Sequence, residues 1–173
     1  MRRARVTEVD EIAVLAALTF PLACPPGSTP ADQREFIETA LSSSMFRRYL
    51  ADPARTVLVA HDGGAQLVGY AMVVGGVPAD PDVSQALTLF PTAELSKLYV
   101  HPARHRSGVA SALMRAALDD ARARSASGVW LGVNQLNTRA QAFYTAAGFR
   151  RVGVKHFQVG GRLEDDFVYE RML

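Results

Sequence analysis

A short glycine-containing segment in the middle of the chain has the composition of an anion-binding turn. The segment HRSGVAS spans residues 105–111, follows an apolar run that ends at Val100, and leads into ALMRAALDDARAR. A turn that feeds a helix N-terminus presents N–H groups without intrahelical acceptors at the positive end of the helix dipole. Gly108 has no Cβ, so a ligand can come close to the backbone. The segment therefore predicts a phosphate site, and a glycine that merely permits a tight strand-to-helix connection is the alternative.

Two common phosphate-binding motifs do not explain this segment. The nucleoside-triphosphate loop requires G-x-x-x-x-G-K-[ST], and no lysine stands at the corresponding place. The dinucleotide motif requires G-x-G-x-x-G after the first strand, whereas this segment has one glycine and lies in mid-chain. A different phosphate-bearing ligand is therefore indicated.

The elements around this segment predict an α/β fold with a mixed sheet around a parallel centre, flanked by helices. Hydrophobic periodicity and turn residues predict strands over 3–7, 55–62, 65–76, 93–100, 129–134, 149–160 and 166–173, with GRLED joining the last two. They predict helices over 8–19, 31–52 in two pieces broken near the serines, 107–124 and 137–148. Gly128 and Gly148 are expected to end the last two helices.

Composition limits the classes of protein to consider. With 173 residues, 49% of them hydrophobic, the chain is expected to form one domain over 1–173. A net charge of +2 without interleaved aromatic and basic residues gives no argument for nucleic acid. No segment has the length and apolarity of a membrane span. A single cysteine, Cys24, is typical of a cytoplasmic protein, and the histidines lack the spacing of metal ligands.

Two longer segments resemble a known superfamily. ELSKLYVHPARHRSGVASALM (94–114), followed by VWLGVNQLNTRAQAFYTAAGF (129–149), resembles the GNAT superfamily of acyl-CoA-dependent N-acetyltransferases. The resemblance implies the acyl-CoA N-acyltransferase fold, with a centrally splayed sheet, acetyl-CoA as the donor and no metal. It covers 55–173, the sheet and acetyl-CoA-binding core. It implies that 1–54 supplies the acceptor-side helices and a first strand, and that the protein is a homodimer.

The resemblance also implies which residues bind acetyl-CoA. The superfamily's diphosphate loop, [QR]-x-x-G-x-[GA], matches the six residues from His105 to Ala110, although His105 departs from the usual Gln or Arg and Arg104 or Arg106 would have to compensate. The splayed strand that pairs with the pantetheine matches residues 98–100. The superfamily's asparagine at the start of the last helix, which holds the pantetheine, matches Asn137, and Ala140 lies one turn further on. The implied cofactor-binding residues are Leu98, Tyr99, Val100, His105, Arg106, Ser107, Gly108, Val109, Ala110, Ser111, Asn137, Ala140 and Tyr144.

The expected chemistry needs a base and an acid. An alkylamine with a pKa of about 10.4 must lose a proton before it can attack a thioester at neutral pH. Glu94, at the start of the splayed strand, is the candidate base, and a solvated strand-end carboxylate is the alternative. Tyr144 matches the superfamily's tyrosine that protonates the departing thiolate, and a core tyrosine is the alternative. A backbone N–H near Leu98 to Val100 would stabilise the carbonyl oxygen.

The acceptor amine is less well defined. The C-terminal segment 149–173 and WLGV (130–133) are similar to bacterial polyamine acetyltransferases, which favours a small amine such as a polyamine. A protein acetyltransferase acting on a terminal amine or a lysine is the second interpretation. A non-catalytic acyl-CoA-binding module is the third.

Overall fold

The computed structural model describes residues 1–25, 27–159 and 162–173. Over these residues, seven strands form one sheet in the order β1-β2-β3-β4-β5-β7-β6. The strands are β1 (Arg2–Arg3), β2 (Arg55–His61), β3 (Leu67–Gly75), β4 (Thr92–Val100), β5 (Gly128–Asn134), β6 (Arg150–Val159) and β7 (Arg162–Met172). The helices are α1 (Val9–Thr19), α2 (Pro30–Ala40), α3 (Ser43–Ala51), α4 (Pro81–Ala86), α5 (Val109–Ala123) and α6 (Thr138–Ala146). Short 3₁₀ turns are η1 (Val6–Glu8), η2 (Phe20–Ala23) and η3 (Pro102–Arg104).

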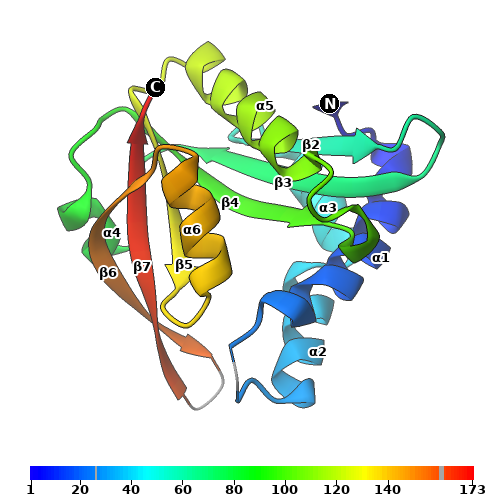
Figure 1. Ribbon diagram of the computed structural model, residues 1–173, viewed down its shortest axis with the longest axis horizontal. Helices are drawn as coiled ribbons and strands as arrows, with labels where there is room; N and C mark the ends of the chain where they lie inside the picture. Colours follow the sequence, from blue (N-terminus) through cyan, green and yellow to red (C-terminus); the bar gives the residue numbers. More distant parts are fainter. Residues whose placement is uncertain (26, 160–161) are drawn as a thin grey trace.

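The centre of the sheet is splayed. The parallel strands β4 and β5 pair only from Thr92 to Glu94, opposite Gly128 to Trp130, and then diverge, as Figure 1 shows. A bulge follows at once in β4, because Met72 lies opposite Lys97 while Val73 lies opposite Leu95. Within the described ranges, the β5-facing edge of β4 therefore has no partner strand beyond Glu94. The predicted α/β fold with a mixed, centrally splayed sheet is confirmed.

Two layers of helices cover opposite faces of this sheet (Figure 1). Helix α5 packs through Leu113, Ala117 and Ala121 on one face, where the partly buried residues of α6 join the same apolar cluster. Helices α1 and α3 pack through Ile12 and Phe46 on the other face of β2 and β3. On that same second face, α4 covers Trp130. Among the described residues, none of the helices has the length and apolar content that a membrane span requires.

The break within the predicted helix 31–52 is set by capping residues. Thr29 caps α2 by accepting a hydrogen bond from the Asp32 N–H, and Asp32 bonds back to Thr29. Ser42 accepts from the Met45 N–H and caps α3. The two helices are therefore separate elements that meet near the serines, as expected.

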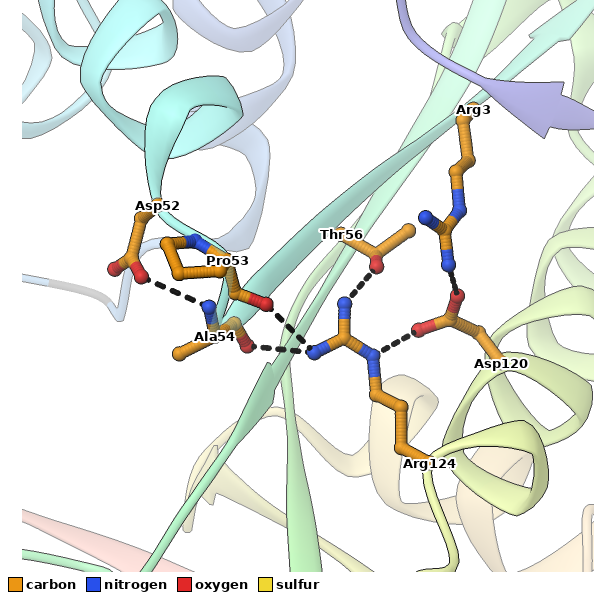
Figure 2. A network of polar contacts seen from close by, with 7 residues as sticks. All are labelled: Arg3, Asp52, Pro53, Ala54, Thr56, Asp120 and Arg124. Carbon is orange, nitrogen blue, oxygen red and sulfur yellow. Dashed lines mark hydrogen bonds and ion pairs between the residues drawn. The ribbon is translucent and has the colours of Figure 1, made fainter.

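A polar network fixes the C-terminal end of α5 to the second strand (Figure 2). The Arg124 guanidinium donates to Asp120 at 2.9 Å, to the carbonyls of Pro53 and Ala54, and to Thr56. Arg3 contacts the other oxygen of Asp120 at 2.7 Å. Because these contacts hold the C-terminal end of α5, they also fix the direction in which its N-terminus points.

The predicted boundaries of the first and the last strand are wrong. The strand expected over 3–7 is only Arg2–Arg3, because the Arg5 N–H donates to the Glu8 carboxylate at 2.8 Å and the chain turns into η1. The last strand begins at Arg162 rather than 166, since pairing with β6 continues from Val159 opposite Arg162. Most of the expected GRLED connection is thus strand, and Gly161 lies outside the described residues.

The prediction that Gly128 ends α5 is wrong. The helix ends earlier, where Ser125 takes the left-handed conformation with φ 61° and the Ala126 N–H donates to the Ala121 carbonyl. Gly128 is the first residue of β5, and a Cβ there would lie 2.7 Å from the Leu89 Cβ. Close packing therefore explains this glycine. Gly148, with φ 84°, does end α6 as expected.

Candidate active site

The 105–111 loop has the backbone geometry of an anion site. Arg106 (φ 62°) and Gly108 (φ 83°) are left-handed, and α5 begins at Val109, two residues later than the sequence predicts. Gly108 is the N-cap, and no side chain caps the helix. A Cβ built on Gly108 meets nothing within 4 Å. The first-turn N–H groups of α5 therefore lie beside open space where a phosphate can be bound.

The side chains of this loop have different partners. Arg104 contacts Asp62 at 2.7 Å, which fixes it to the β2–β3 turn. The His105 ring bonds through Nε2 to the Val100 carbonyl at 3.2 Å, so this nitrogen carries the proton and donates. Among the described residues Arg106 has no such partner, and it is exposed. Arg106 is therefore the side chain that can add positive charge to the loop.

The splayed strand directs alternate residues to opposite sides. Leu98 and Val100 pack toward α5, whereas Tyr99 packs with the cluster under α1 and α3. The His101 N–H donates to the Val68 carbonyl at 2.8 Å, so by antiparallel alternation the backbone groups of Tyr99 face β3. Those of Leu98 and Val100 face the gap. Of residues 98–100, these two carry the backbone groups that could pair with a ligand in the gap.

Helix α6 brings Asn137 and Tyr144 to the gap from the other side. The Asn137 side chain accepts from the Ala140 N–H at 3.0 Å and caps α6, as expected, which leaves its amide NH₂ able to donate elsewhere. The half-buried Tyr144 ring packs edge-on against Phe143 and Phe149, at centroid distances of 5.4 and 6.0 Å.

Burial raises the pKa of Tyr144 to about 12. Its hydroxyl therefore stays protonated at neutral pH. Within the described part of the chain, that hydroxyl makes no hydrogen bond. It is a proton donor without a protein acceptor.

Glu94 occupies the point at which the sheet separates. It is the last β4 residue that pairs with β5, opposite Trp130, and it is half-buried. Its neighbours Ala93 and Leu95 pack toward α5, so Glu94 lies on the opposite face of the sheet. The carboxylate is thus separated from the 105–111 loop by the thickness of the sheet, at the narrow end of the gap.

The face that carries Glu94 also holds residues that sequence reasoning missed. Burial lowers the pKa of Lys97, an effect that the nearby Glu94 carboxylate opposes, and the Lys97 ammonium lies 5.8 Å from the centre of the Tyr49 ring. Tyr99 stacks on Tyr70 at 5.5 Å. A strand pattern could have indicated this face, but the bulge after Leu95 shifts the alternation by one residue.

Tyr99 lies among groups from distant parts of the chain. Burial raises the pKa of Tyr99 well above its usual value, and Tyr144, Cys24 and Asp166 raise it further. These three residues come from α6, from the end of η2 and from β7. Nothing local in the sequence shows that Cys24 and Asp166 approach Tyr99.

The comparisons with known proteins agree with this geometry. A family model described as the acetyltransferase (GNAT) family matches residues 21–149, and the chain belongs to that family. An uncharacterised N-acetyltransferase of Mycobacterium tuberculosis is 46% identical over 169 residues, which is 97% of this chain and 99% of the relative. The protein is therefore an acetyl-CoA-dependent N-acetyltransferase, which transfers an acetyl group from acetyl-CoA to an amine.

Two further similarities concern the fold and a shorter segment. The crystal structure of the PaiA N-acetyltransferase from Thermoplasma acidophilum, in complex with coenzyme A, superimposes with a TM-score of 0.76 at 16% identity, over 99% of this chain and 97% of that one. A [ribosomal protein bS18]-alanine N-acetyltransferase of Haemophilus ducreyi is 38% identical over 68 residues, which is 39% of this chain and 47% of that relative.

Proposed function

We propose that the enzyme acetylates the primary amine of a small molecule by direct attack of the amine on the thioester, with polyamines among the candidate acceptors. The observation that carries this proposal is the gap between β4 and β5. An anion-binding loop lies at one side of the gap, and a carboxylate lies at its narrow end on the opposite face of the sheet. Donor and acceptor can therefore approach the same point from different faces.

The residues around the gap fit coenzyme A, which when bound supplies the activated acetyl thioester. The amides from Arg106 to Ser111 would hold the diphosphate, because they lie beside open space at a helix N-terminus. Backbone groups of Leu98 and Val100 would pair with the pantetheine, with Tyr99 between them. His105 would contribute by orienting the Val100 carbonyl, to which its ring is bonded.

Helix α6 would contact the pantetheine of coenzyme A from the side opposite β4. The Asn137 amide NH₂ would donate to a pantetheine carbonyl while its oxygen caps the helix. Ala140, one turn further on and half-buried, is small enough to leave room for the arm.

Glu94 would take the proton from the acceptor amine, directly or through water. An alkylammonium with a pKa of about 10.4 must be deprotonated to attack, and a positioned carboxylate can accept that proton. The N–H of Leu98 or Val100 would stabilise charge on the carbonyl oxygen.

Tyr144 would hold a proton at its hydroxyl oxygen for the departing sulfur. A thiol has a pKa of about 8.5, and burial keeps the Tyr144 phenol protonated well above that value. The phenol can therefore donate a proton or a hydrogen bond as the C–S bond breaks.

A protein acceptor is the second candidate, and one observation favours it. That observation is the similarity to the bS18-alanine N-acetyltransferase of Haemophilus ducreyi. On this candidate, the enzyme acetylates the N-terminal amine of a protein. A non-catalytic acyl-CoA-binding module does not explain why Tyr144 and Glu94 approach the same gap.

Release of free thiol from acetyl-CoA across a panel of acceptors tests the proposal. The panel contains polyamines, amino acids, aminoglycosides and peptides with an N-terminal alanine. Turnover with a small amine such as spermidine, and none with the peptides, is expected. Turnover with the peptides alone would replace the proposal by the second candidate, and coenzyme A binding without turnover anywhere would overturn both.

We also propose that the enzyme is a cytoplasmic homodimer. The resemblance to the GNAT superfamily supports the dimer, and the single cysteine Cys24 supports the reducing compartment. Light scattering of the purified chain measures the oligomeric state, and a monomer at micromolar concentration would contradict the dimer.

A further inference from the structure

Two oppositely charged side chains lie on the face under α1 to α3 without contacting each other. Glu94 and Lys97 both project from β4 to this face, because the bulge after Leu95 shifts the alternation of the strand. The Glu94 carboxylate acts electrostatically on the Lys97 ammonium. Among the described residues, however, neither side chain takes part in an ion pair or a hydrogen bond. The two groups are therefore near each other, with room for a ligand to contact both.

The surroundings of the Lys97 ammonium offer it little compensation for its charge. The side chain is half-buried, and its nitrogen lies 5.8 Å from the centre of the Tyr49 ring. The Tyr49 hydroxyl donates to the Ala40 carbonyl at 3.1 Å. Burial of a charged group costs free energy unless an opposite charge contacts it, and burial lowers the pKa of Lys97 accordingly. A bound anion would supply the missing contact.

The Lys97 ammonium is within reach of such a ligand. Within the described part of the chain, the Tyr70 hydroxyl is the one fully buried side-chain nitrogen or oxygen without a partner. The Lys97 nitrogen also lacks a partner, so it retains exposed surface. Arg55, the other cation beside the Tyr49 ring, contacts Asp52 at 2.9 Å. Of these two cations, Lys97 is therefore the one that is available to a ligand.

The proposed function places the acceptor amine at Glu94, and the inference rests on that placement. An acceptor whose amine contacts Glu94 has the Lys97 ammonium beside it on the same face of the sheet. A carboxylate separated from the amine by a single carbon, as in an amino acid, is close enough to reach that ammonium. The pair would be a charge-assisted hydrogen bond. A second ammonium at the same point would instead meet a like charge.

We propose that the acceptor carries a carboxylate close to its amine, as an amino acid does, and that Lys97 binds this carboxylate. Lys97 is then a specificity-determining residue, which narrows the small amines of the proposed function to a class. Amines without the carboxylate, including spermidine and the amides of amino acids, are acetylated less efficiently. The N-terminal residue of a peptide has an amide in place of the carboxylate, so peptides are disfavoured for the same reason.

Free amino acids and their amides are matched acceptors that test the proposal. Thiol release from acetyl-CoA gives kcat/KM for each acid and its amide. The wild-type enzyme is expected to favour the best acid over its amide by about 10- to 100-fold. Lys97→Met removes the charge and keeps an unbranched side chain. It should lower kcat/KM for the acid by about 10- to 100-fold, mainly through KM, and change that for the amide by less than about 2-fold.

Three further variants locate the effect. Lys97→Arg retains the charge and should restore part of the selectivity. Arg47→Gln removes an exposed charge of α3, whose partner Asp10 lies 3.8 Å away, and should leave the selectivity unchanged. If Arg55→Gln rather than Lys97→Met abolishes the selectivity, the assignment to Lys97 is wrong. Equal losses for the acid and the amide in Lys97→Met would also overturn it, because a structural or proton-transfer role does not distinguish the two acceptors.

The outcomes separate this inference from the proposed function. A wild-type enzyme that uses amides and simple amines as efficiently as amino acids would overturn the inference and leave the proposed function standing. The absence of turnover with every small amine would overturn both.

Discussion

The two faces of the splayed sheet are built by different means. The face under α5 and α6 offers backbone groups and small residues, such as Gly108 and Ala140, beside the gap. The face under α1 to α3 offers aromatic and charged side chains, among them Glu94, Lys97 and Tyr99. A cosubstrate common to a whole family can be bound by backbone geometry, whereas a particular acceptor requires particular side chains. Changes on the two faces should therefore affect different constants.

The largest effect is expected for Tyr144→Phe. Tyr144 lies at the β4–β5 gap, where we propose that it donates to the departing sulfur. Removal of the phenol should lower kcat by about 10²-fold or more and leave the dissociation constant of coenzyme A nearly unchanged. Steady-state kinetics with the best acceptor, together with calorimetry, separate the two constants. Near-normal turnover would assign Tyr144 to packing alone.

Glu94→Gln should change the kinetic constants for the acceptor and leave coenzyme A binding unchanged, because Glu94 lies on the face under α1 to α3. We expect kcat/KM for the acceptor to fall by about 10- to 100-fold at neutral pH, because the amide cannot accept a proton. The loss should shrink as the pH approaches about 10, where the amine is already neutral. A pH profile of both enzymes measures this convergence, and a loss that is independent of pH would rule out the role of base.

Gly108→Val should weaken coenzyme A binding specifically, because Gly108 lies on the face under α5 and α6. A β-branched residue is strained at φ 83°, so the loop should rearrange and weaken coenzyme A binding by about 10-fold. Gly76→Val is a matched control, because Gly76 has φ 117°, also has open space around it and lies directly after β3. That control should lose stability but keep the dissociation constant. Equal losses of binding in both variants would argue against a specific role for the loop.

Glu8→Gln tests how much the ion pair between Arg2 and Glu8, at the start of α1, stabilises the fold. Hydrogen bonds from Arg2 lower the pKa of Glu8 to about 2, so its stabilising contribution is present above the ordinary carboxyl pKa and is lost as the pH falls toward 2. Chemical denaturation should show a loss of about 1–2 kcal/mol at neutral pH and a smaller difference near pH 2. The coenzyme A dissociation constant should not change, and a constant difference at all pH values would contradict the ion-pair explanation.

The smallest effect is expected for Tyr70→Phe. Among the described residues, the Tyr70 hydroxyl is the one buried side-chain polar atom without a hydrogen-bond partner, and the ring has no exposed surface. Its removal should change the free energy of unfolding by less than about 0.5 kcal/mol, or increase it, because no hydrogen bond is lost. A loss well beyond that value in urea denaturation would indicate that a buried water bonds the hydroxyl.

Part of the backbone geometry on the face under α5 and α6 was predictable from the sequence because it is local. A capping asparagine and a terminal glycine each act within one turn, and Asn137 and Gly148 were identified in this way. Gly108 was singled out because it lacks a Cβ, but the helix was expected to begin at 107 and its left-handed N-cap conformation was not predicted. The splayed centre of the sheet was predicted from the resemblance to GNAT enzymes and not from local sequence patterns. Gly128 was misinterpreted because its reason is contact with Leu89, far away in the sequence.

The face under α1 to α3 was less predictable because the arrangement of its side chains depends on long-range contacts. The bulge after Leu95 places Lys97 and Tyr99 on the face of Glu94, and alternation counted along the sequence does not show that shift. Cys24 and Asp166 come close to Tyr99 only after the chain has folded.

A crystal structure with bound coenzyme A gives the most direct test of how donor and acceptor are divided between the two faces. The account predicts that the diphosphate accepts hydrogen bonds from amides between Arg106 and Ser111, while the thiol lies in the β4–β5 gap within reach of the Tyr144 hydroxyl. A diphosphate bound away from that helix N-terminus, or a thiol on the far side of α6, would contradict it.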